Sequence, residues 1–150
     1  MIPEPLAARR DLLAALLDAL LPPGGAFPGA GAVAPDHVLA VATASADLES
    51  LLSRGLDATE ETARASGAVG LLALGADDRE RVLHRVEAAH PEFFEALVRH
   101  TYEGYYSHPT VIAQLGLDPR PPHPHGHRVE PVDIPDLARV TARGPLYRPA

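Results

Sequence analysis

Cysteine and lysine are both absent from the 150 residues of this chain. Without cysteine, the chain can form no disulfide, thiolate nucleophile, cysteine-held iron–sulfur cluster or cysteine-based zinc site. Long apolar runs are missing too, since no stretch reaches the roughly twenty residues that a transmembrane helix needs. Any chemistry therefore rests on histidine, carboxylate, serine and tyrosine side chains.

Positive charge is scarce as well. Thirteen arginines stand against 20 acidic residues, which gives a formal net charge of -7. The arginines form no basic patch or stripe along the sequence, and nucleic-acid binding would require one. A chain of this length suits one domain with its own core, and we expect a single small domain that does not bind nucleic acid.

Apolar residues recur at helical spacing in much of the sequence. Leucines at three- and four-residue steps over residues 6–21 predict an amphipathic helix. The glycine- and proline-rich residues 22–35 end that helix and form a loop that is either exposed or held by another part of the structure. Residues 35–66 predict two helices divided near Ser45, which looks like an N-cap, and Gly55 indicates a close helix crossing.

Two further helices follow, separated at His90 and Pro91. Asp77 with Glu80 resembles a capping box at the start of the first. The second places one apolar face on the core: Phe94, Leu97, Val98, Thr101 and Tyr105.

Another face of this second helix carries Tyr102 and Tyr106 beside an i,i+4 pair of Glu95 and Arg99. Exposed tyrosines on this face would form a binding surface, because a monomer rarely leaves such aromatic area uncovered. Alternatively, the tyrosines pack against the C-terminal tail of the same chain.

The fold class predicted is all-α: a small irregular bundle of about five to six helices with an extended proline-rich C-terminal tail. No useful length of strand alternation is present. Residues 1–116 form the helical body, and residues 117–150, with eight prolines, form a tail within the same domain.

Histidines in the tail raise a metal-binding alternative. His123, His125 and His127 alternate, so an extended backbone would place them on one side. Pro124 and Gly126 put them on an exposed loop with no evident acidic partner, and we expect polar contacts there instead of a specific metal site. Histidines at positions 84, 90, 100 and 108 lack the spacing of a helical zinc motif and are expected to be structural or solvated.

No catalytic or cofactor-binding set emerges from the sequence. A nucleophile elbow of the GxSxG type is absent. The segment "GGAFPGAG" lacks both the preceding strand of a dinucleotide-binding turn and the Gly-Lys of a phosphate loop. The adjacent pairs of acidic residues lie at helix starts or on polar faces, where they serve the helix dipole or solubility. We therefore expect no catalytic residue, no bound cofactor and no metal in this chain.

Several segments together resemble the gluconate 2-dehydrogenase subunit 3 family. They are "LLDALLPPGGAFPGAG", "FFEALVRHTYEGYYSHP" and "GLDPRPPHPHGHRVEPVDIPDLARVTARGPLYRP". The most specific parts are the GYY-x-x-P element at residues 104–109 and the closing "RGPLYRP" at residues 143–149.

The resemblance implies a small helical subunit of an oxidoreductase complex. Its partner would be an FAD-dependent dehydrogenase of the glucose–methanol–choline class that oxidises sugars, sugar acids or polyols, often with a cytochrome c subunit. The small subunit would bind, stabilise or mature that partner, and a self-sufficient metal-binding protein is the alternative. The residues predicted to bind the partner are Tyr102, Tyr105, Tyr106, His108, Pro109, Arg120, His125, Arg143, Tyr147 and Arg148.

Two departures from the family pattern affect these expectations. Many members begin with a twin-arginine signal, whereas here Arg9 and Arg10 precede a stretch interrupted by Asp11 and Asp18, which predicts a helix. We therefore expect a cytoplasmic complex, with periplasmic export alongside the partner as the alternative. The stretch after GYY also differs, reading "SHPTVIAQLGLDP".

A further possibility is that His108 or His125 reaches into the partner's substrate pocket.

Overall fold

The computed structural model describes residues 5–118 and 141–144 of the chain. In these residues the secondary structure is helical, with an isolated antiparallel bridge between Gly24 and Phe27 and no named strand. The prediction of an all-α fold is confirmed. The elements are η1 (Leu6–Arg9), α1 (Arg10–Leu20), α2 (Ala30–Val33), α3 (Pro35–Thr43), α4 (Ala46–Ala65), η2 (Leu71–Ala73), α5 (Ala76–Ala89), α6 (Pro91–Ser107) and α7 (Pro109–Gln114).

Contacts between residues divide the chain into residues 1–119 and residues 120–150. In the second unit, the described residues 141–144 form a turn in which the Gly144 amide donates to the Thr141 carbonyl over 3.2 Å. The predicted partner-binding role of residues 117–150 stays a prediction and concerns mostly residues outside the described ranges.

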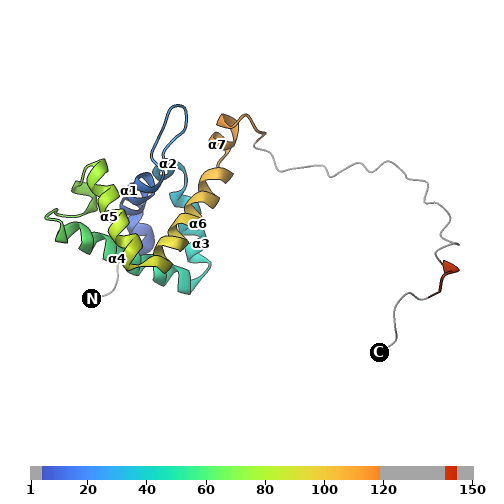
Figure 1. Cartoon of the computed structure of the whole chain (residues 1–150), viewed down its shortest axis with the longest axis horizontal. Helices are drawn as coiled ribbons and strands as arrows, with labels where there is room; N and C mark the ends of the chain where they lie inside the picture. The colour runs from blue at the N-terminus through green and yellow to red at the C-terminus, as the bar shows by residue number, and fades with distance from the viewer. Residues whose placement is uncertain (1–4, 119–140, 145–150) are drawn as a thin grey trace. The chain divides into compact units, whose positions relative to one another are not determined.

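Helix α1 lies at the centre of the helical body and packs against α2, α3 and α5 (Figure 1). The leucine face predicted from the sequence is its buried face, with Leu13, Leu16 and Leu17 fully buried. Burying a leucine side chain stabilises the fold by about 1.5 to 3 kcal/mol. The spacing of the leucines therefore predicted the buried face of α1 correctly.

The predicted division of residues 35–66 is also confirmed. Helix α3 ends at Thr43 and α4 begins at Ala46, with Ser45 as the N-cap whose hydroxyl accepts from the Leu48 amide over 3.4 Å. Gly55 lies where α4 crosses α6, because a Cβ at this position would overlap the ring of Phe93. The close helix crossing predicted at Gly55 is present.

The glycine- and proline-rich segment after α1 is partly exposed and partly held. Residues 22–26 are exposed, whereas Gly29, Ala30 and Gly31 are buried and begin the short helix α2. The Gly31 amide donates to the Asp18 carboxylate over 2.7 Å. Side chains at Gly29 or Gly31 would collide with Asp18, so the glycines allow α1 and α2 to approach closely.

The boundary between α5 and α6 falls where the sequence predicts it, since α5 ends at Ala89 and Pro91 is the first residue of α6. The predicted capping box is wrong: Gly75 is the N-cap of α5, and Asp77 lies inside the first turn. The buried face of α6 is also rotated from the predicted one. Phe93 is buried and Phe94 only partly so, because α4 offers a space for an aromatic ring at Gly55.

Within residues 5–118 and 141–144, none of the helices combines the length and the apolar composition that crossing a membrane requires.

Candidate functional site

The exposed tyrosines of α6 form the most distinctive surface feature of the described residues. Tyr102 is 45% exposed and Tyr106 is 52% exposed. Their rings meet edge to face with centroids 5.9 Å apart. Phe94 and Val98, both partly exposed, precede them at four-residue steps, and such steps form a ridge along a helix. We call these four residues the α6 ridge.

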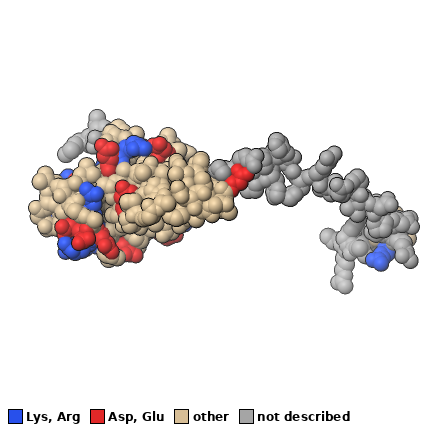
Figure 2. All heavy atoms as spheres, turned by 90° about the horizontal axis from the view of Figure 1, so that it is seen from above, with Lys and Arg blue, Asp and Glu red and all other residues tan. Residues whose placement is uncertain are grey.

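Charged side chains border one end of the α6 ridge, because Phe94 and Val98 line a surface hollow together with Glu87, Glu95 and Arg99. On the face seen in Figure 2, charged side chains gather over one end of the described body, and few lie over its other end. Glu95 and Arg99 form an i,i+4 ion pair of 3.0 Å beside the ridge. An aromatic surface with a polar rim is typical of a protein interface. The alternative, packing against the tail, involves residues outside the described ranges.

Tyr105, which the sequence analysis included among the partner-binding residues, lies in the core. It is 5% exposed, and its hydroxyl donates to the Pro28 carbonyl over 2.9 Å. Burial, with a smaller contribution from the neighbouring Tyr106, raises the pKa of Tyr105 above its ordinary value. The ring of Tyr105 also contacts that of Tyr106 edge to face at 5.2 Å. Tyr105 therefore supports the exposed surface from beneath.

The remaining predicted partner-binding residues are spread over several places. His108 is half-buried and acts as the N-cap of α7, its Nδ1 accepting from the Thr110 amide over 3.3 Å. Pro109 is exposed and opens α7, and Arg143 is exposed. The structure thus brings Tyr102, Tyr106, His108 and Pro109 to one end of the body. The others lie outside the described residues: Arg120, His125, Tyr147 and Arg148.

A second group of titratable side chains joins α3 to α6. The Glu103 carboxylate oxygen Oε2 lies 2.7 Å from Nδ1 of His100 and 3.5 Å from Nε2 of His37. The hydrogen bond from His100 is the main reason that the pKa of Glu103 is lowered; His37 adds to the effect, while partial desolvation opposes it. The sequence analysis missed this group. The i,i+3 spacing of His100 and Glu103 was visible, but nothing in the sequence associates His37 with them.

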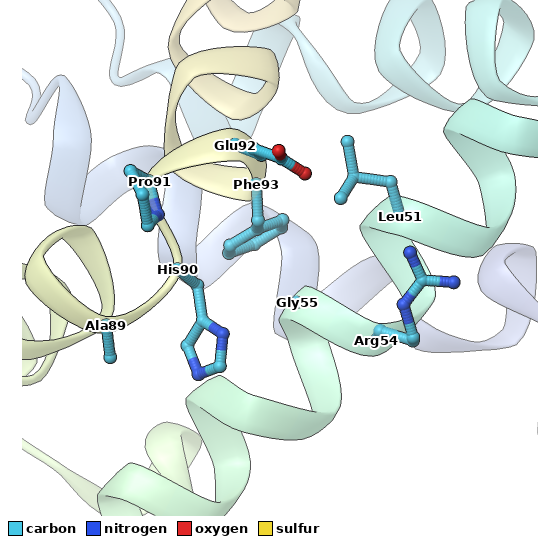
Figure 3. Close-up of a pocket in the computed structure, with 8 residues that line it drawn as sticks. All are labelled: Leu51, Arg54, Gly55, Ala89, His90, Pro91, Glu92 and Phe93. Atoms are coloured by element: carbon cyan, nitrogen blue, oxygen red, sulfur yellow. The ribbon is translucent and has the colours of Figure 1, made fainter.

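A hollow of about 370 Å³ lies where α4 meets the junction of α5 and α6. Figure 3 shows Phe93 against Gly55 in this hollow, with His90 and Arg54 on either side. The guanidinium of Arg54 is engaged by its own helix, donating to Ser50 Oγ over 2.6 Å. The hollow is open to solvent and its polar groups do not converge on one point, so it lacks the features of a built small-molecule site.

Comparison with known proteins identifies the chain through one family. No curated protein and no solved structure matches it. The model of the family described as gluconate 2-dehydrogenase subunit 3 matches residues 7–119, which include every helix from α1 to α7. The closing "RGPLYRP" lies beyond the matched residues, so that part of the resemblance stays a prediction. The chain belongs to the gluconate 2-dehydrogenase subunit 3 family.

Proposed function

We propose that this chain is a non-catalytic accessory subunit that binds and stabilises an FAD-dependent dehydrogenase of the glucose–methanol–choline class. The partner would carry the FAD and oxidise a sugar, sugar acid or polyol, and this chain would bind no cofactor. The observation that carries the proposal is the exposed pair Tyr102 and Tyr106 on α6, in a chain whose family name describes a dehydrogenase subunit.

The exposed tyrosines can supply substantial binding energy. An aromatic side chain has about 150 to 250 Å² of surface to bury. With about half of that still exposed at Tyr102 and Tyr106, a partner would cover roughly 70 to 130 Å² on each. At about 25 cal/mol per Å², covering this area would contribute at most about 2 to 3 kcal/mol per tyrosine, before the costs of association are subtracted. This agrees with the 2 kcal/mol or more that marks an interface hot spot.

Preorganisation of these rings strengthens the argument. Tyr106 is held between the rings of Tyr102 and Tyr105, and Tyr105 is fixed by its hydrogen bond to the Pro28 carbonyl. Side chains that are already ordered lose less conformational entropy when they bind. A ridge of four-residue steps also matches the groove of a partner helix. We infer that the α6 ridge packs against a helix of the dehydrogenase subunit.

Two other functions are weaker. A self-sufficient metal-binding protein using His123, His125 and His127 depends on residues outside the described ranges, and the family assignment does not favour it. A residue lent to the partner's substrate pocket could come from His108, but this imidazole caps α7. Full turnover by the large subunit alone, with an unchanged Michaelis constant, would argue against such a contribution.

Co-expression with a candidate FAD-dependent large subunit from the same genome tests the proposal. Size-exclusion chromatography recorded at the flavin absorbance bands should show a yellow complex that contains both chains. If the candidate partner is flavin-loaded, stable and fully active alone, and the small chain elutes separately and colourless, the proposed function is wrong.

Paired variants test the proposed surface. Tyr102→Ala and Tyr106→Ala should each weaken the complex by roughly 30-fold, the equivalent of about 2 kcal/mol. Val69→Ala is the matched control, because Val69 is 88% exposed and lies outside α6. Far-UV circular dichroism should show unchanged helicity in all three. An affinity of the double tyrosine variant equal to that of the control would remove the α6 ridge from the interface.

A further inference from the structure

Three side chains that can bind a metal converge between α3 and α6. His37 comes from α3, and His100 and Glu103 come from α6. One ligand atom from each lies within 4.8 Å of those of the other two. His100 and Glu103 are three residues apart, so they lie on one face of their helix.

The packing of the two helices fixes His37 in this position. A Cβ on Gly104 would come within 2.9 Å of the His37 Cβ and 3.1 Å of its Cγ. The absence of a side chain at Gly104 therefore lets the base of His37 lie directly against α6. The same glycine begins the GYY element of the sequence, so part of that element serves to bring α3 to α6.

His37 has a nitrogen that the described structure leaves without a hydrogen bond. Its Nε2 atom is buried and has no hydrogen-bond partner, and the nearest charged group is the Glu103 carboxylate at 3.5 Å. A buried polar atom without a partner is costly and needs an explanation. A ligand bound by the lone pair of this nitrogen would supply one.

The donor set and spacing suit a borderline divalent cation. Two imidazoles and one carboxylate are ligands that Zn²⁺ uses, with bonds of about 2.0 to 2.2 Å. Tetrahedral geometry with such bonds separates ligand atoms by about 3.3 Å. The His37–Glu103 separation of 3.5 Å is close to this, and the 2.7 Å of His100–Glu103 must lengthen slightly. Glu103 is 47% exposed along its side chain and has the room to move.

We propose that His37, His100 and Glu103 bind one Zn²⁺ ion that ties α3 to α6 and leaves a fourth position for water. His100, with a side chain 13% exposed, and His37, at 35%, form the inner wall, and Glu103 faces solvent. The ion would rigidify α6 next to Tyr102, in the α6 ridge. The site is independent of the dehydrogenase partner, and it departs from the expectation that this chain binds no metal.

The test begins by removing the competing histidines of the tail. In the full-length chain, His123→Ala, His125→Ala and His127→Ala provide a background without that cluster. Titration of this background with Co²⁺ should give visible d–d absorption that saturates at one equivalent, and Zn²⁺ should displace the Co²⁺. No saturable binding at one equivalent would overturn the proposal.

Site variants in this background locate the ion. Glu103→Gln and His37→Ala should each lower the Zn²⁺ affinity at least tenfold and abolish the Co²⁺ absorption. His84→Ala is the matched control: His84 also lies near two carboxylates, 3.4 Å from Glu87 and 3.8 Å from Glu80. The His84→Ala variant should change neither the Zn²⁺ affinity nor the Co²⁺ absorption. Zn²⁺ should raise the melting temperature of the background and of His84→Ala, but not that of Glu103→Gln.

Circular dichroism of the metal-free variants shows whether each variant still folds. If His37→Ala does not fold, the isosteric Glu103→Gln and a His100→Gln variant carry the test. Unchanged Zn²⁺ affinity and stoichiometry in folded Glu103→Gln and His100→Gln would place the ion elsewhere and refute the site.

Discussion

Replacing Gly55 with alanine should destabilise the protein even though alanine is the better helix former. In the interior of α4, alanine is favoured over glycine by about 1 kcal/mol. Against this, a Cβ at Gly55 would overlap Cγ of Phe93, at the base of a ring that is only 2% exposed. Overpacking of a filled core costs about 1 to 3 kcal/mol. Because the overlap is with the ring itself, we expect the upper part of that range and a net loss of about 1 to 2 kcal/mol.

The second part of the experiment removes the Phe93 ring that a Cβ at Gly55 would overlap. Phe93→Ala should itself cost about 3 to 5 kcal/mol. In that background the overlap no longer exists, so Gly55→Ala should stabilise the protein by about 1 kcal/mol. The sign of the effect therefore reverses, and the coupling between the two positions amounts to about 2 to 3 kcal/mol, as expected for residues in direct contact.

Urea denaturation followed by far-UV circular dichroism measures these free energies of unfolding. Gly24→Ala is the control, because a Cβ there meets nothing within 4 Å, and it should change stability by less than about 0.5 kcal/mol. Stabilisation by Gly55→Ala in the otherwise unchanged protein would refute the reasoning. So would equal effects in the two backgrounds.

Three further predictions concern the contacts that hold α2 and α6. Asp18→Ala should cost about 1 to 2 kcal/mol in thermal or urea denaturation, because the Gly31 amide loses a charged acceptor, and Asp18→Asn should cost less. Tyr105→Phe should cost about 1 to 3 kcal/mol by leaving the Pro28 carbonyl without its donor, and an unchanged midpoint would contradict that role. Because burial raises the pKa of Tyr105 in the folded state, its contribution to stability is complete below the ordinary tyrosine pKa of about 10. It is lost as the pH rises through the folded pKa. This alkaline loss should be smaller in Tyr105→Phe, and an identical pH profile in both proteins would exclude it.

Most helix boundaries were predictable because their causes act within one turn of chain. Ser45 caps α4 through its own side chain. Pro91 is the first residue of α6, a position where its missing amide hydrogen costs no hydrogen bond within the helix. The capping box at Asp77 shows the limit of such reasoning. A carboxylate followed by Glu80 has the right spacing, but α5 starts earlier at Ala76, and no side chain caps it.

The faces of helices were less predictable than their ends. Periodicity identified the buried leucines of α1, since any helix with one wide apolar face buries that face. In α6 two adjacent phenylalanines both fit a buried stripe. The burial of Phe93 in preference to Phe94 depends on Gly55, which lies on another helix and is distant in sequence.

By itself, the sequence determined the helical class, the main breaks between helices, the leucine core of α1 and the position of Tyr102 and Tyr106 on a face of α6 apart from its apolar face, all of which follow from local spacing. Only the tertiary structure decided that the Tyr105 hydroxyl donates to the Pro28 carbonyl, 77 residues away, and that His37 meets His100 and Glu103. Such contacts depend on which helices pack together and on where small residues such as Gly104 let them approach. That information resides in the assembled core, where distant segments constrain one another, and local sequence patterns do not carry it.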